Sequence, residues 1–185
     1  MNDYLSFLRQ WASAPLQVAA LAPSGRALAE LMTEGLNAHS GPIIELGPGT
    51  GVFTQAMIDK GIPQENLALI ELNPDFAEML QDRFPKARVY NINAAELKDR
   101  SFFERPASQV LSGLGLLSMP KPLVTEIIQG VFHQLKPGGS FVQFTYGPKC
   151  PVHPDIREDL GLRYERVGGT LRNFPPASVY RLRQK

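Results

Sequence analysis

Residues 43–51 read Ile43-Ile44-Glu45-Leu46-Gly47-Pro48-Gly49-Thr50-Gly51, an apolar segment followed by glycines at three alternate positions. The apolar segment predicts a buried strand, and residues 52–60 behind the loop predict a helix that ends at Gly61. Glycine adopts a positive φ easily and lets a ligand approach the backbone where a Cβ would clash. The segment therefore predicts a loop that binds a nucleotide-like ligand, although the same pattern also occurs in plain strand-to-helix turns.

A carboxylate follows the next predicted strand. Residues 67–70 are apolar and lead into Glu71, 20 residues after Gly51, where a carboxylate can accept hydrogen bonds from both hydroxyls of an adenosine ribose. A hydride-transfer enzyme would place its third glycine one residue later and face a pyrophosphate with helix amides. S-adenosylmethionine has no phosphate but carries a sulfonium and an amino-acid end, for which an acidic Glu45 is useful. The pattern therefore favours a methyltransferase over a dehydrogenase.

The composition is that of an ordinary globular protein. With 43% apolar and 20% charged residues, the chain predicts one domain, residues 1–185, with a sizeable core. The net charge of +1 excludes a strong global attraction to nucleic acid or anionic lipid, although the chain is modestly basic after Pro151. The single cysteine, Cys150, excludes an internal disulfide, and we expect no metal site, no membrane-spanning helix and a cytoplasmic location.

Residues 1–40 predict two helices. Over residues 1–13 one helical face is apolar and carries Tyr4 and Trp11, while the polar face has one cation, Arg9. Three interpretations of this first helix stay open: it covers the protein's own core, it closes over the cofactor, or it lies at a membrane interface. Ser24 is the expected N-cap of the second helix, which extends to about residue 38.

The rest of the chain alternates strands with helices. Further strands are expected at 67–71, 87–90, 109–112, 140–146, 162–167 and 178–182, and further helices at 75–84 and 123–135. The segment 137–139 is the expected turn into the fifth strand, and the last two strands form a terminal hairpin. This alternation predicts an α/β fold with a Rossmann-like, doubly wound, mostly parallel seven-stranded sheet, helices on both faces and one antiparallel strand, which we expect at the edge.

Residues just after each strand are the candidates for ligand binding, because ligands of doubly wound sheets lie outside the carboxyl ends of the strands. These candidates are residues 47–51, 71–74, 92–95, 112–115 and 146–147. Each has a structural alternative, since Asn93 also fits a turn cap and Ser112-Gly113 also fits a plain loop. The convergence of all five segments at one sheet edge favours a binding site.

At these positions the chain resembles the bacterial phospholipid N-methyltransferases, soluble enzymes that methylate phosphatidylethanolamine and are similar to the rRNA adenine dimethyltransferases. The resemblance covers nearly the whole length. It rests on the glycine segment 44–51 and on Ala22-Pro23-Ser24, Ile70-Glu71-Leu72-Asn73-Pro74, Val110-Leu111-Ser112-Gly113-Leu114, Leu117-Ser118-Met119-Pro120, Leu135-Lys136-Pro137-Gly138-Gly139, Phe144-Thr145-Tyr146-Gly147-Pro148, and the tail segments Leu171-Arg172-Asn173-Phe174-Pro175-Pro176-Ala177 and Val179-Tyr180-Arg181.

The resemblance implies S-adenosyl-L-methionine as the cofactor, with Glu71 at the ribose, Asn93 at the adenine amino group and Ser112-Gly113-Leu114 near the transferable methyl. The full set of implied cofactor contacts is Glu45, Gly47, Gly49, Thr50, Gly51, Glu71, Leu72, Asn93, Ala94 and Ser112. Two positions depart from the family pattern. Asn93 replaces the usual aspartate and accepts without a charge, and Gly115 replaces a proline, which loosens the loop that faces the acceptor.

Methyl transfer from a sulfonium needs alignment and exclusion of water more than covalent catalysis. We expect Ser112, Gly113, Leu114 and the Tyr146 hydroxyl to orient the acceptor amine, although Tyr146 also fits a half-buried tyrosine at a strand end. For the substrate we select aromatic residues that can face a cation and arginines that can pair with a lipid phosphate, and surface arginine is the alternative for the latter. These candidates are Tyr4, Trp11, Tyr146, Arg172, Tyr180 and Arg181, and Ser24 is added to them as a further substrate candidate.

The leading hypothesis is an N-methyltransferase of the phosphatidylethanolamine headgroup that acts peripherally on the inner face of the membrane, without a metal or a stable nucleic-acid complex. One alternative is an RNA adenine N6-methyltransferase, which would show an Asn-Leu-Pro-Tyr type of loop and a broad basic face where this chain has Ser112-Gly113-Leu114-Gly115. A second alternative is a catalytically inactive cofactor-binding module, which the departures at Asn93 and Gly115 keep open.

Overall fold

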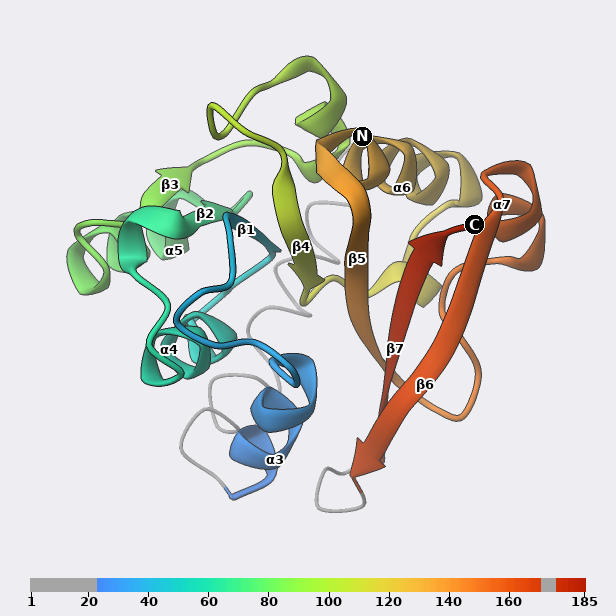
Figure 1. The fold of residues 1–185 in the computed structure, drawn as a ribbon, viewed down its shortest axis with the longest axis horizontal. Helices are drawn as coiled ribbons and strands as arrows, with labels where there is room; N and C mark the ends of the chain where they lie inside the picture. Colours follow the sequence, from blue (N-terminus) through green and yellow to red (C-terminus); the bar gives the residue numbers. More distant parts are fainter. Residues whose placement is uncertain (1–22, 171–175) are drawn as a thin grey trace.

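The chain forms a single mixed sheet covered by helices. In the computed structural model, which describes residues 23–170 and 176–185, the strand order is β3-β2-β1-β4-β5-β7-β6 (Figure 1). The strands are β1 (Ile43–Leu46), β2 (Leu67–Ile70), β3 (Arg88–Tyr90), β4 (Ala107–Ser112), β5 (Leu135–Tyr146), β6 (Leu162–Thr170) and β7 (Ala177–Gln184). The helices are α3 (Pro23–Met32), α4 (Val52–Asp59), α5 (Pro74–Arg83), α6 (Lys121–Gln134) and α7 (Pro154–Asp159), with short 3-10 helices η1 (Gln64–Asn66), η2 (Ala94–Asp99) and η3 (Leu116–Ser118).

The sheet confirms the predicted fold class but not the predicted place of its antiparallel strand. Strands β1 to β5 pair in parallel, whereas β7 runs antiparallel to both of its neighbours, β5 and β6. The prediction that the antiparallel strand lies at the edge is therefore wrong, because β7 inserts between β5 and β6 and leaves β6 at the edge. Strand order depends on contacts between segments distant in sequence, which the local pattern does not contain.

Helices cover both faces, as predicted. Alternate residues of β1 point to opposite sides: Ile44 and Leu46 join a core cluster with α6 and α7, whereas Ile43 joins a cluster with α3, α4 and α5. This two-sided burial explains the nearly continuous apolar sequence of the central strands.

The elements differ from the sequence prediction in several places. The second helix contains Ser24, so the prediction that Ser24 is its N-cap is wrong. It ends at Met32 rather than near residue 38, and Gly35 then takes a left-handed φ of 80°. The expected turn at 137–139 lies within β5, where the pairing of β4 with β5 shifts register between Ala107 and Gln109. Helix α7, which has six residues, has no counterpart in the prediction.

The helix predicted over residues 1–13 lies outside the described residues. Among residues 23–170 and 176–185, no helix has the length and apolar character needed to cross a membrane.

Candidate cofactor and acceptor site

The glycine loop after β1 contains three left-handed glycines with different surroundings. The φ angles of Gly47, Gly49 and Gly51 are 63°, 54° and 80°. A Cβ on Gly47 would lie 2.7 Å from Leu114 Cδ2, and one on Gly51 would lie 2.6 Å from Phe84 Cε2. A Cβ on Gly49 would meet no described heavy atom within 4 Å. All three φ angles favour glycine; in addition, a Cβ on Gly51 would meet the Phe84 ring and one on Gly47 would displace the end of the Leu114 side chain, whereas Gly49 leaves space through which a ligand can approach the backbone.

The carboxylate of Glu71 is tied directly to this loop. Its Oε2 accepts a hydrogen bond from the backbone N–H of Gly49 at 3.0 Å, and its Oε1 accepts one from the N–H of Asn73 at 2.9 Å. The residue is 7% exposed, and burial raises the pKa of the carboxyl above its usual value. Asn91, the residue after β3, supports the backbone at this position, because its Nδ2 donates to the carbonyls of Glu71 and Leu72 at 2.9 and 3.0 Å. The sequence prediction did not include Asn91.

Glu45 is a buried carboxyl beneath the loop. Its Oε2 accepts a hydrogen bond from the Thr54 hydroxyl at 2.6 Å, whereas its Oε1 has no hydrogen-bond partner among the described residues. Burial raises the pKa of Glu45 to about 7, and the nearby charge of Glu71 acts in the same direction. The contact joins β1 to α4, and Thr54 is a second residue that the sequence prediction did not select.

Asn93 caps the turn after β3. Its Oδ1 accepts a hydrogen bond from the N–H of Ala95 at 3.0 Å, and Glu96 Oε1 accepts one from the N–H of Asn93 at 3.2 Å, which completes a capping box at the start of η2. Asn93 therefore does cap a turn, which was the alternative to a ligand contact at this position. Its side-chain oxygen keeps a second lone pair that could still accept a hydrogen bond. The adenine contacts expected of Asn93 and of the adjacent buried Ala94 stay predictions.

The loop after β4 contacts the glycine loop closely. Gly113 donates its N–H to the carbonyl of Leu46 at 2.8 Å, and a Cβ on Gly113 would lie 2.6 Å from the carbonyl oxygen of Gly47. The buried Ser112 accepts a hydrogen bond from the N–H of Leu114 through its Oγ at 3.2 Å. The structure therefore brings together the two loops in which the sequence placed the cofactor and the acceptor.

Gly115 forms an inverse γ-turn in this second loop. Its φ of −79° and ψ of 64° accompany a hydrogen bond from Leu116 N–H to the carbonyl of Leu114 at 3.0 Å. The Leu114 carbonyl also accepts from Gln143 Nε2 at 2.9 Å. Both of its lone pairs are then used, so it is not available to orient an amine.

Tyr146 ends β5 with a half-buried side chain. Its ring packs edge-on against Phe144 with centroids 5.5 Å apart, and burial raises the pKa of the phenol above its usual value. The hydroxyl is therefore neutral at physiological pH and can both donate and accept a hydrogen bond.

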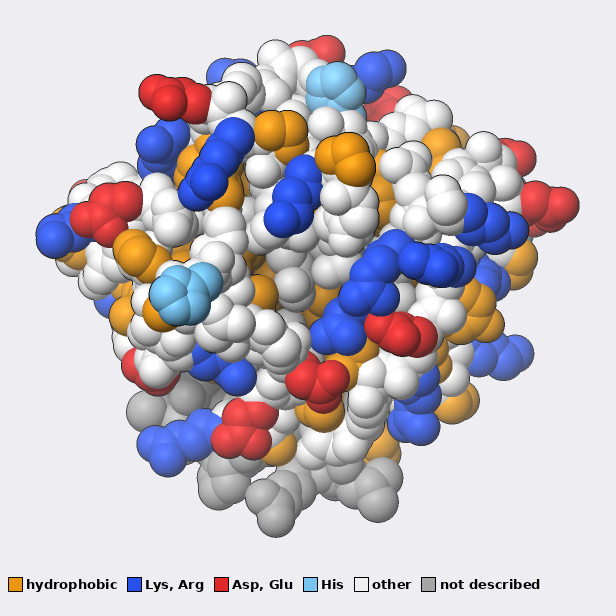
Figure 2. Space-filling view, viewed as in Figure 1, with side chains coloured by type: hydrophobic (Ala, Val, Ile, Leu, Met, Phe, Trp, Pro, Cys, Tyr) orange, Lys and Arg blue, Asp and Glu red, His pale blue; other side chains and the backbone are white. Residues whose placement is uncertain are grey.

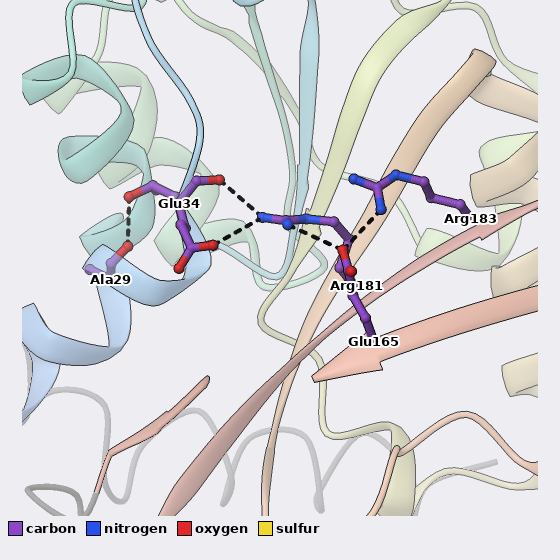
Figure 3. A network of polar contacts seen from close by, with 6 residues as sticks. Ala29, Glu34, Glu165, Arg181 and Arg183 are labelled. Atoms are coloured by element: carbon purple, nitrogen blue, oxygen red, sulfur yellow. Dashed lines mark hydrogen bonds and ion pairs between the residues drawn. The ribbon is translucent and has the colours of Figure 1, made fainter. Parts of the chain in front are cut away.

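Two of the substrate candidates are engaged within the protein. Tyr180 is 3% exposed and donates its hydroxyl hydrogen to the carbonyl of Pro148. Arg181 lies between Glu165 of β6 and the turn after α3 (Figure 3): it pairs with Glu165 at 3.3 Å and donates to the Glu34 carbonyl at 3.1 Å. Glu165 also binds Arg183 at 2.9 Å. These side chains hold β7 to its neighbours.

The other substrate candidates are not described. Tyr4, Trp11 and Arg172 lie outside the described residues, as does the side chain of Ser24.

On the face in Figure 2, Lys and Arg side chains are interspersed with Asp and Glu side chains. Within the described ranges, no three His, Cys, Asp or Glu side chains are grouped so that they could hold a metal ion.

Comparison with known proteins finds similarity to a lipid N-methyltransferase along nearly the whole chain and to ribosomal RNA methyltransferases along less than half of it. The chain is 28% identical to an ornithine lipid N-methyltransferase of Singulisphaera acidiphila over 188 aligned residues, which cover 97% of this chain and 95% of the relative. It is 31% identical to ribosomal RNA small subunit methyltransferase A of Porphyromonas gingivalis, but over only 46% of this chain and 30% of that protein. No family model matches the sequence.

Solved structures share the fold. The N-methyltransferase NodS of Bradyrhizobium japonicum, in complex with S-adenosyl-L-homocysteine, superposes with a TM-score of 0.71 at 14% identity and covers 100% of this chain and 99% of its own. The glycopeptide N-methyltransferase MtfA, in complex with S-adenosyl-L-methionine, has a TM-score of 0.66 at 12% identity, with 87% and 94% coverage. The chain thus has the Rossmann-like fold of S-adenosylmethionine-dependent methyltransferases, as expected from the resemblance.

Proposed function

We propose that this protein is an S-adenosylmethionine-dependent N-methyltransferase whose acceptor is the primary amine of a membrane lipid. The observation that carries the proposal is the similarity to a lipid N-methyltransferase along 97% of the chain. The shared fold supports the cofactor, because MtfA and NodS were solved with S-adenosylmethionine and S-adenosylhomocysteine.

The residues at the carboxyl ends of β1 and β2 fit this cofactor. Gly49 leaves open space above the backbone, and the Glu71 carboxylate is held in place by two amides while keeping lone pairs for ribose hydroxyls. Glu45 Oε1 has no hydrogen-bond partner among the described residues, and the carboxyl adds negative potential next to the loop when it is ionised, which its pKa of about 7 makes partial at neutral pH. When bound, S-adenosylmethionine supplies an electrophilic methyl group on a positively charged sulfur, so the protein need not supply a nucleophile.

The chain's own residues then align the acceptor. Gly113 holds the second loop against the glycine loop through its hydrogen bond to the Leu46 carbonyl, and Ser112 Oγ accepts the N–H of Leu114 within the second loop. This arrangement supports an acceptor site next to the cofactor. An amine attacks only when neutral, and a site that excludes water lowers the amine pKa. The neutral Tyr146 hydroxyl, at the end of β5, accepts a hydrogen bond from the amine in this proposal. The expected gain comes from orientation rather than from acid–base chemistry.

Two lipids carry a suitable amine. The sequence resemblance indicates phosphatidylethanolamine, whereas the full-length relative is named for ornithine lipid. Both present a primary amine at a membrane surface, so we propose that the protein associates peripherally with the membrane. The RNA alternative is supported by a similarity that covers less than half of the chain.

The acceptor can be identified from the products. We would incubate the protein with S-adenosylmethionine and vesicles that contain phosphatidylethanolamine or ornithine lipid, with RNA in a parallel reaction, and analyse each by mass spectrometry. Added methyl masses on either lipid support the proposal and name the acceptor. Methylated RNA without methylated lipid supports the alternative, and cofactor binding without any product supports an inactive module.

A further inference from the structure

A buried glutamine lies beneath the acceptor loop. Gln143, in the middle of β5, is 0% exposed, and its Nε2 lies 2.9 Å from the carbonyl oxygen of Leu114 and 2.7 Å from that of Phe144. An amide NH2 group has two hydrogens, so it donates one to each carbonyl. The two carbonyls also fix which way the Gln143 amide points. In the flipped orientation, the amide oxygen would face two carbonyl oxygens and could not form a hydrogen bond with either of them.

Gln143 and Ser112 hold Leu114 from both sides. The two residues are register partners across β4 and β5. Ser112 Oγ accepts the N–H of Leu114 at 3.2 Å, and Gln143 donates to the carbonyl of the same residue. Both backbone polar groups of Leu114 are thus anchored on side chains that project from the rigid sheet.

Leu114 contacts the glycine loop through its side chain, next to the backbone contact that Gly113 makes with Leu46 and Gly47. Its Cδ2 lies so close to Gly47 that a Cβ there would be at 2.7 Å. A displacement of Leu114 therefore changes the distance between the two loops. In the proposed function, the methyl group and the amine must meet between these loops. An alignment error of about 1 Å is enough to slow an enzymatic reaction by roughly 100-fold.

We propose that Gln143 is a positioning residue for methyl transfer: its amide holds Leu114, and with it the 112–115 loop, in the register that aligns the acceptor with the cofactor. The inference rests on the proposed function. A packing role alone would be filled better by leucine or methionine, because Gln143 leaves its Oε1 buried without a partner among the described residues. The glutamine is explained by the two hydrogen bonds that it donates.

A matched pair of variants separates positioning from general stability. Gln109 is also buried, lies in the neighbouring strand β4, and has an Nε2 without a partner among the described residues, but it pairs with Ser140 away from the acceptor loop. Gln143→Met should lower kcat about 10- to 100-fold while the cofactor Kd changes less than about twofold. Gln109→Met should keep kcat within about twofold of the wild type. An unchanged kcat in Gln143→Met, or an equal loss in both variants, would overturn the inference.

The charge variant gives a pH signature. In Gln143→Glu a carboxylate would face the carbonyls of Leu114 and Phe144, and only the protonated form can donate a hydrogen bond to one of them. The kcat of Gln143→Glu relative to wild type should therefore rise as the pH is lowered from 8 to 6, whereas the same ratio for Gln143→Met should stay flat. A flat ratio for both variants counts against the inference.

Amide hydrogen exchange tests the same contact without turnover. In Gln143→Met the amides of Leu114 and Leu116 should exchange at least about tenfold faster than in wild type and in Gln109→Met. If the wild type transfers no methyl group, the proposed function fails while the exchange result still decides whether Gln143 holds the loop. Equal exchange in all three proteins would overturn the inference.

Discussion

The carboxylate of Glu71 accepts a hydrogen bond from the backbone N–H of Gly49 at 3.0 Å, so the acidic end of β2 and the glycine loop after β1 form one unit. The second carboxylate oxygen is held by Asn73 at 2.9 Å. The carboxylate is therefore oriented before a ligand arrives, which reduces the entropy lost on binding.

Glu71→Gln should weaken S-adenosylmethionine binding. Glutamine has one acceptor oxygen, so its NH2 group would face the N–H of either Gly49 or Asn73. Hydrogen bonds to charged groups are worth about 2 kcal/mol, which corresponds to roughly 30-fold in Kd. Titration calorimetry measures this loss, and Glu78→Gln, an exposed position on α5, is the control that should bind normally. Equal affinities of the two variants would contradict the ribose role of Glu71.

Gly49→Ala should separate ligand clearance from backbone strain. Gly49 and Gly138 have φ angles of 54° and 75°, and a Cβ on either meets no described heavy atom within 4 Å. Alanine at either position should cost about 1–2 kcal/mol of stability. Only the Cβ at Gly49 enters the space over the glycine loop, so Gly49→Ala should bind cofactor more weakly than Gly138→Ala. Urea unfolding and calorimetry provide the two measurements, and equal affinities would show that the cofactor does not approach Gly49.

Glu45→Gln should change the pH dependence of stability. The folded-state pKa of Glu45 is raised by burial from 4.5 to about 7, so the native state holds the proton more tightly than the unfolded chain. Stability therefore falls as the pH rises through this interval, by about 3 kcal/mol in total, and stays low above it. Glutamine is neutral and can accept the Thr54 hydrogen bond, so the variant should match wild type near pH 4.5 and exceed it at pH 8. Urea unfolding at both pH values gives the free energy of unfolding of each protein. If the difference between Glu45→Gln and wild type is the same at pH 4.5 and pH 8, Glu45 is not a buried group that titrates in this interval.

Gly115→Pro should be tolerated and stabilising. Gly115 has a φ of −79° in its inverse γ-turn, a value within the range of proline. Proline restricts the unfolded chain, so the free energy of unfolding should rise by about 0.4–1 kcal/mol. The measurement is urea unfolding, and a loss of stability would show that the turn needs the glycine N–H.

Trp11→Glu should abolish co-sedimentation with lipid vesicles if the predicted N-terminal helix is the membrane contact. The substitution places a charge on the apolar face, where it opposes insertion at the interface. Cofactor affinity should not change. Gln10→Glu adds the same charge on the polar side of the predicted helix and is the matched control. If Trp11→Glu co-sediments with vesicles as well as wild type does, the predicted N-terminal helix is not the membrane contact.

The local sequence was sufficient to predict that the glycine loop and Glu71 lie together. The glycine loop and Glu71 follow apolar strands, and the rule that ligands lie at the carboxyl ends of parallel strands places them together. Asn93 shows the limit of this rule, because the same side chain is also suited to capping η2, and the structure shows the cap.

Residues that act across the sheet were not predictable in this way. Gln143 lies in mid-strand and contacts Leu114, which is 29 residues earlier in the chain. Its signal in the sequence is a polar residue within the buried run Phe141-Val142-Gln143-Phe144, which indicates a buried hydrogen-bond partner but not its identity. The position of β7 inside the sheet likewise depends on pairing with both β5 and β6.

The most direct measurement is the initial rate at which labelled methyl passes from S-adenosylmethionine to vesicles that contain phosphatidylethanolamine or ornithine lipid, with wild type and Glu71→Gln compared at one subsaturating cofactor concentration. The account predicts label in lipid with the wild type and a rate at least about tenfold lower with the variant. Label that appears only in RNA, or a lipid rate that Glu71→Gln leaves unchanged, would contradict it.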